Sequence, residues 1–74
     1  MVVGRGNLGA VVAVVLGSFR SRDGLWRVVV IKERGMQWAQ LYHGEHLLED
    51  KLVIGTLDYY LHQHGIDWAD LVEE

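Results

Sequence analysis

The sequence has no cysteine and no proline among its 74 residues. The absence of cysteine excludes disulfide scaffolds, thiolate zinc sites and cysteine nucleophiles. The longest apolar run, Ala10–Leu16, is far shorter than the roughly 18–20 residues that a membrane-spanning helix needs. No basic segment precedes this run, so it does not predict a secretory signal peptide. We therefore expect a cytoplasmic protein without a membrane partner, of the size and composition found in small bacterial or phage proteins.

What is present is typical of a small globular domain. Half of the residues are hydrophobic and 23% are charged, which is too apolar for a disordered chain. Three glycines in residues 1–9 predict a flexible arm. A mass of 8.4 kDa fits one domain, which we expect to span residues 10–74.

The first half of the chain predicts an antiparallel meander of three strands. Residues 10–20 are rich in valine, which disfavours helix. An Asp-Gly turn at 21–24 leads into a second strand at 25–33, and a tight turn at Arg34-Gly35 leads into a third at 37–43.

The second half predicts helices, although residues 44–55 fit either a helix or an extended segment. Thr56 is a good N-cap for a helix that Gly65 ends in a left-handed conformation. Asp67 is predicted to cap a second helix that runs to Glu74, with Asp70 completing an aspartate version of the capping box. The predicted fold is α+β, in the order β-β-β-α-α, with the helices on one face of the sheet.

The predicted strands are apolar on both faces, whereas a strand with one solvated face alternates apolar and polar residues. In the second strand, Leu25, Val29 and Ile31 share one face, and Trp26, Val28 and Val30 share the other. Two short helices cover only one sheet face, so the other needs a second copy, or the N-terminal arm folded back over it. We expect a homo-oligomer. Its interface candidates are Val12, Val14, Val28, Val30 and Trp38.

Charge is divided between the two halves of the chain. Residues 1–34 hold six basic and two acidic side chains, and residues 35–74 hold one basic and eight acidic ones. This division indicates either two halves that attract each other, within or between chains, or a nucleic-acid face with an acidic rear. We favour the first interpretation.

The basic residues concentrate around the first predicted turn. A two-stranded ribbon fits the DNA major groove, and arginines beside exposed aromatic rings suit single strands. The binding candidates in this hairpin are Phe19, Arg20, Arg22, Trp26 and Arg27.

The layout of residues 17–20 and 24–28, followed by a strand and a helix, resembles the three-stranded arm-type DNA-binding domain of tyrosine recombinases. The resemblance covers about residues 17–61 and implies DNA contact through the hairpin. The sequence departs from that pattern because its third strand carries Gln37, Gln40 and Tyr42 in place of basic residues, its helix is acidic and no recombinase catalytic domain follows. We do not assign the chain to that family.

Motifs for cofactor, metal and catalysis are weak. Residues 4–9 match the dinucleotide-binding pattern G-x-G-x-x-G, but only three residues precede it and a valine-rich strand follows, so we predict no cofactor. On a helix, His62 and His64 point about 200° apart, and pairing them with His43 and His46 gives no convincing metal site. The hydroxyl groups of Ser18, Ser21 and Thr56 have no evident base, so we predict no catalytic residues and no enzyme.

We therefore expect a small non-enzymatic protein-interaction module that forms a homo-oligomer and binds an unidentified protein. The alternative is a small DNA- or RNA-binding regulator that uses the basic hairpin at residues 19–27. Such a regulator would bind nucleic acid with an affinity that falls steeply as salt rises.

Overall fold

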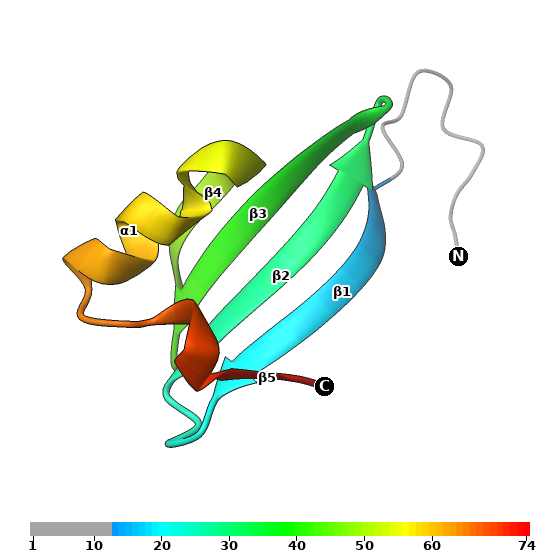
Figure 1. Cartoon of the computed structure of the whole chain (residues 1–74). Coiled ribbons are helices and arrows are strands. Elements are labelled where there is room, and N and C mark those ends of the chain that lie inside the picture. Colours follow the sequence, from blue (N-terminus) through cyan, green and yellow to red (C-terminus); the bar gives the residue numbers. More distant parts are fainter. Residues whose placement is uncertain (1–12) are drawn as a thin grey trace.

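The computed structural model describes residues 13–74, which form an antiparallel sheet with one helix on one of its faces (Figure 1). The order of strands across the sheet is β4-β3-β2-β1-β5. The predicted arm at 1–9 lies outside the described residues. The elements are β1 (Ala13–Ser21), β2 (Trp26–Glu33), β3 (Met36–His43), β4 (His46–Val53), the 3-10 turn η1 (Ile54–Thr56), α1 (Leu57–Gln63), the 3-10 turn η2 (Trp68–Asp70) and β5 (Leu71–Glu73).

The three predicted strands are confirmed as the first three of a four-strand meander, with starts that differ by one residue for β2 and β3. The β2–β3 turn has positive φ at both central residues, 53° at Arg34 and 77° at Gly35. The type I′ turn requires this geometry, and its twist matches that of the flanking strands. The α+β class is therefore correct, but the order β-β-β-α-α is wrong because the sheet has five strands.

The ambiguous stretch at 44–55 is mainly the fourth strand, β4, which follows β3 through a turn at Gly44-Glu45. Its pairing with β3 shifts register twice, and Lys51 has a φ of 54°. These irregularities break the simple alternation of apolar and polar residues. They explain why periodicity did not separate strand from helix here.

The predicted helix after Thr56 is α1, and its end is the Schellman motif that a glycine favours. The amide of Ile66 donates to the carbonyl of Leu61 (2.9 Å), and the amide of Gly65 (φ 75°) donates to the carbonyl of His62 (3.0 Å). Leu61 and Ile66 are both buried in the core. Thr56 occupies the N-cap position, but its hydroxyl donates to the carbonyl of Val53 (2.7 Å) and caps no helical amide.

The second predicted helix is wrong. Asp67 accepts a hydrogen bond from the amide of Ala69 (3.1 Å), as an N-cap does, but only the single 3-10 turn η2 follows. The chain then pairs as β5 with β1, with Leu71 opposite Ser21 and Glu73 opposite Phe19. Free backbone groups at the edge of β1 give this segment hydrogen-bond partners that an isolated short helix lacks.

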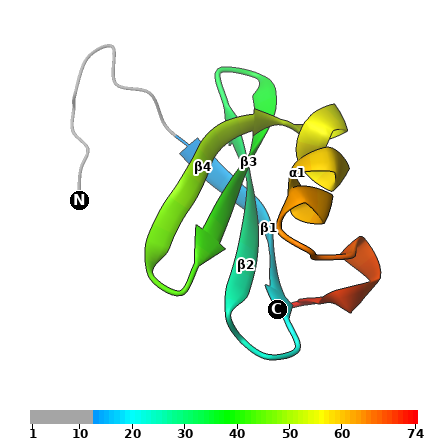
Figure 2. The same ribbon diagram turned by 90° about the vertical axis from the view of Figure 1, so that its left-hand side faces the viewer.

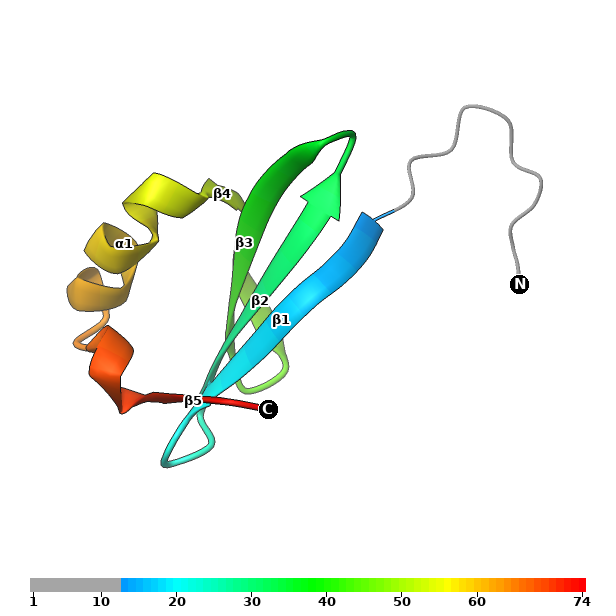
Figure 3. The ribbon, with the colours of Figure 1, turned by 45° about the vertical axis from the view of Figure 1, so that its right-hand side comes forward.

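The core lies between the sheet and the segment α1–η2, which arches from β4 back to β5 on one side of the sheet (Figures 2 and 3). Val28, Leu41 and Leu61 are fully buried. Ala39, Leu52, Leu57 and Ile66 complete the buried cluster. No helix in residues 13–74 is long and apolar enough to cross a membrane.

Candidate functional site

The two faces of the sheet differ in what covers them. Trp26, Val28 and Val30 of β2 face α1 and pack in or against the core. Val29 and Ile31 point to the opposite side, which we call the helix-free face because α1 and η2 both lie on the other side (Figure 3). The predicted separation of Val29 and Ile31 from Trp26, Val28 and Val30 is therefore confirmed, whereas Leu25 lies before β2.

One row of apolar side chains crosses the helix-free face from β1 to β4. The strand register places Val15 opposite Ile31, Ile31 opposite Trp38, and Trp38 opposite Val53. Ile31, at the middle, is buried, whereas Val15 and Val53 at the ends are 62% and 56% exposed. We call these four residues the apolar row.

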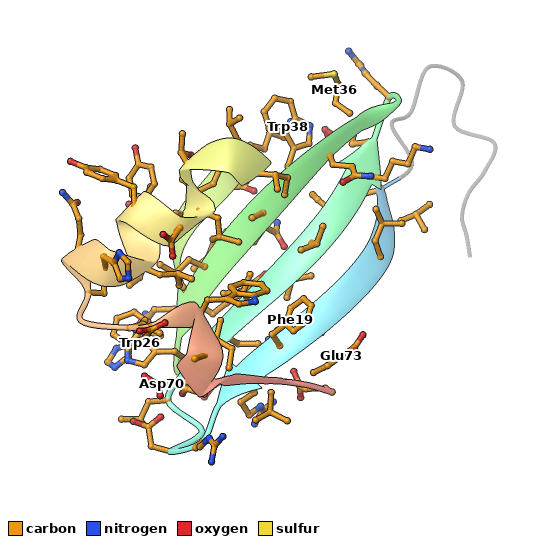
Figure 4. All side chains as sticks on the ribbon, viewed as in Figure 1. Phe19, Trp26, Met36, Trp38, Asp70 and Glu73 are labelled. Carbon is orange, nitrogen blue, oxygen red and sulfur yellow. The ribbon has the colours of Figure 1, made fainter. Side chains whose placement is uncertain are left out.

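Polar groups lie beside the apolar row, at the end of the sheet that carries the β2–β3 turn. The Lys51 ammonium lies 2.9 Å from the Glu33 carboxylate, so this ion pair joins β4 to β2. A hollow of about 450 Å³ opens here, lined by both residues together with Arg34, Met36 and Trp38. Figure 4 shows Met36 and Trp38 together at this end of the sheet.

The opposite end of the helix-free face is basic. Arg20 lies directly opposite Arg27, and Arg27 lies opposite Tyr42. The Arg20 Nε atom lies 3.2 Å from the Glu74 carboxylate, and the Arg27 guanidinium lies 4.9 Å above the Tyr42 ring. A hollow of about 460 Å³ opens beside these arginines and is also lined by Glu45. The charge of Arg20 is therefore partly neutralised by Glu74.

The hairpin does not bring its aromatic and basic side chains together as the sequence led us to expect. Phe19 packs against the Trp68 ring (5.1 Å between centroids), and Trp26 lies between the rings of His43 (4.4 Å) and His64 (5.1 Å). Both aromatic rings belong to the helix-covered face (Figure 4). The five binding candidates are therefore split, with Arg20 and Arg27 on the helix-free face and Arg22 in the exposed turn.

The predicted interface residues are also divided between the two faces. Val28 and Val30 belong to the helix-covered face, so the assignment of these two to an oligomer surface is corrected. Trp38 lies in the apolar row, whereas Val14, opposite Lys32, is exposed on the other side of β1. Val12 lies outside the described residues. Ile31, Val15 and Val53 were missed, although the two-residue period of β2 and β3 relates Ile31 to Trp38.

The chain matches no protein-family model, no curated protein and no solved structure. The surfaces described above are therefore interpreted from their own geometry.

Several of the residues considered for metal binding and catalysis contact other groups. Among residues 13–74, no three His, Asp or Glu side chains lie where they could hold a metal ion. The Ser18 hydroxyl donates to the Glu74 carboxylate (2.7 Å), and the Ser21 hydroxyl donates to Asp23. Residues 13–21 form strand β1, whereas a dinucleotide-binding unit requires a helix in this part of the chain.

Proposed function

We propose that this chain is a non-enzymatic protein-interaction module that forms a homo-oligomer and docks through the helix-free face of its sheet. The observation that carries the proposal is the apolar row, Val15–Ile31–Trp38–Val53, which runs across four strands. No helix formed by residues 13–74 lies over this row. The two exposed ends of the row, with the half-buried Trp38, give this face the exposed apolar side chains that commonly mark a binding site for another protein.

The energetic reason for docking is the exposure of the row's two ends. Burial of a valine side chain stabilises by roughly 1.5–3 kcal/mol relative to full exposure. Val15 and Val53 are both more than half exposed. The ion pair between Lys51 and Glu33 supplies the polar border that docking surfaces usually have.

A non-enzymatic role is supported by the engagement of the hydroxyl groups. Ser18 and Ser21 donate to carboxylates, and Thr56 donates to a backbone carbonyl. These hydrogen bonds tie β1 to β5, close the β1–β2 turn and fix the start of α1. None of the three hydroxyls donates to a histidine that would activate it as a nucleophile.

The alternative function, binding of DNA or RNA through residues 19–27, has weaker support. Arg20 is paired with Glu74, and Arg27 is stacked on Tyr42. The Phe19 and Trp26 rings, needed for stacking on bases, pack against Trp68, His43 and His64. Arg22, in the turn, retains the exposure that a phosphate contact needs.

The proposal is tested by light scattering coupled to size exclusion on the full chain. We expect a particle of at least two copies, and a smaller particle for Val53→Lys, which places a charge at the end of the row. The matched control is Tyr59→Lys, because Tyr59 is 62% exposed but lies on α1, on the opposite side of the sheet.

A monomer at all concentrations would contradict self-association. The same experiment is repeated with mixed DNA at low and high salt. A salt-sensitive complex that Arg22→Glu abolishes would favour the nucleic-acid alternative.

A further inference from the structure

The outer edge of β1, on the side away from β2, is only half paired. β5 pairs with Phe19, Arg20 and Ser21, and the amide of Glu74 donates to the carbonyl of Ser18 (2.9 Å). Within residues 13–74, no strand pairs with the outer edge of 13–17. We call residues 13–17 the open half of β1. A strand edge of this kind presents unpaired N–H and C=O groups to any strand that approaches.

The side chains of the open half do nothing to repel another strand. Val14 is 51% exposed, and Val15 and Leu16 are also exposed. The sequence has no charged residue between Arg5 and Arg20. Soluble proteins usually protect an exposed edge with charged side chains, proline, a short strand or a bulge.

The one irregularity in β1 lies inside the open half, near its end. The register with β2 shifts between Val15 and Gly17, which makes Leu16 an extra residue. β5 occupies the strand beyond this bulge, and Ala13, Val14 and Val15 before it keep regular pairing with β2. The regular stretch Ala13–Val15 is three residues long. It is therefore as long as the stretch of β1 that pairs with β5.

We infer that the open half of β1 pairs antiparallel with the open half of a second copy of this chain, which joins the two sheets edge to edge. A two-fold axis at this edge brings identical uncharged segments together, so no like charges meet. The partner segment is identical in sequence to the open half, so it is equally apolar and uncharged. This contact is made by the sheet edge and goes beyond docking through the helix-free face.

The geometry also predicts that this pairing stops at two copies. Each chain has one open half, and a symmetric contact uses both, so no open half remains for a third chain. The other edge strand, β4, carries three consecutive charged residues, Glu49, Asp50 and Lys51, and two register shifts. The symmetric pairing places both α1 helices on the same side and extends the apolar row from Val15 into the second copy.

The test uses two opposite charges at one position on the full chain. Val14 lies on the edge but points away from the helix-free face, so its substitution leaves the apolar row intact. We expect Val14→Lys and Val14→Glu each to halve the mass of the particle in light scattering. Mixing the two variants should restore the wild-type mass, because opposite charges then meet across the axis.

The test of edge pairing gives a result that does not depend on whether docking through the helix-free face also occurs. If the face also joins two copies, wild type contains four chains, Val53→Lys and Val14→Lys each leave two, and the double variant leaves one. An unchanged mass for both Val14 variants overturns the edge pairing, whatever Val53→Lys does. Circular dichroism and protection of the Val28 amide verify that each variant is folded.

Hydrogen exchange distinguishes an edge that is covered by a second copy from an edge that is covered by another segment of the same chain. We expect the outward amides of the open half to be protected at high protein concentration and to exchange rapidly on dilution. Val14→Lys should show rapid exchange at both concentrations. Protection that persists in the diluted monomer would overturn the proposal, because the edge would then be covered by the chain itself.

Discussion

The two edges of the sheet are built in opposite ways. β4 carries Glu49, Asp50 and Lys51, shifts register twice against β3 and has a positive φ of 54° at Lys51. The open half of β1 carries no charge and shifts register only at its end. The features of β4 are those by which proteins prevent edge-to-edge pairing, whereas the open half of β1 has only one of them, the bulge at Leu16.

The contrast extends to how each edge is held by the core. Leu52 of β4 is 7% exposed and belongs to the buried cluster beneath α1. Val15 of β1 lies at the end of the apolar row and is largely exposed. β4 is thus stabilised by its own chain and shielded from others, whereas the open half of β1 has little burial within residues 13–74. This difference is the one we expect if the β4 edge is complete within one chain and the β1 edge is completed by the proposed pairing with a second copy.

The largest expected effect comes from comparing substitutions of the buried Leu52 and the exposed Val15. We expect Leu52→Ala to lower the free energy of unfolding by about 2–5 kcal/mol, because it leaves a cavity in the core. Val15→Ala should lower it by only about 0.5 kcal/mol in dilute protein, as at other exposed positions. Urea unfolding at several concentrations measures both, and the Val15→Ala cost should grow with concentration as lost association adds to it.

Equal costs for the two substitutions in dilute protein would contradict the comparison. That result would mean that Val15 is as well packed within one chain as Leu52. Leu52→Ala removes one more carbon than Val15→Ala, worth about 0.8 kcal/mol when buried, so a difference larger than this reports burial.

A smaller effect is expected from the bulge that protects β4. Lys51→Val places a β-branched residue at a positive φ and removes the ion pair with Glu33. Lys51→Gly removes the same ion pair but accepts the positive φ freely. We expect the valine variant to be less stable than the glycine variant by about 1–2 kcal/mol in urea unfolding, the usual cost of this conformation for a side chain. Equal stability would mean that the bulge does not depend on this conformation.

The sequence predicts the well-paired part of the sheet and misses its two late strands. β2 and β3 were found because valine-rich runs and the turn at Arg34-Gly35 give strong local signals. β4 was left ambiguous because bulges interrupt its alternation. β5 was predicted as helix because Asp67 is a true cap, yet the partner that fixes Leu71–Glu73 as strand is the edge of β1, some 50 residues away in sequence.

The candidate site was predicted in composition but not in arrangement. Phe19 and Arg20 are adjacent in sequence, as are Trp26 and Arg27, so in strands the members of each pair point to opposite faces. Counting alternate positions through the hairpin would have separated the arginines from the aromatic rings. The same counting excludes Val28 and Val30 from the face that carries Trp38. α1 covers one face of the sheet because Leu57 and Leu61 pack against that face. No local sequence pattern indicates which face these two residues cover.

The smallest expected effect concerns the turn that closes the paired half of β1. The pKa of Asp23 is lowered from its ordinary value of 3.8, chiefly because its carboxylate accepts a hydrogen bond from the Ser21 hydroxyl and also one from the Leu25 amide. Because the folded pKa is depressed, the stabilisation is present above pH 3.8 and is lost as pH falls through the folded value.

This linkage is measured by an NMR titration of the Asp23 carboxyl carbon. We expect wild type to titrate below 3.8 and Ser21→Ala to titrate closer to that value, because the strongest of the hydrogen bonds is removed. Ser18→Ala is the matched control, since its hydroxyl contacts Glu74 and not Asp23. A wild-type titration at or above 3.8 would mean that the turn does not hold the carboxylate in solution. The half of β1 that pairs with β5 would then be held only by its pairing with β2 and β5. It would differ less from the open half, which is paired with β2 alone within residues 13–74.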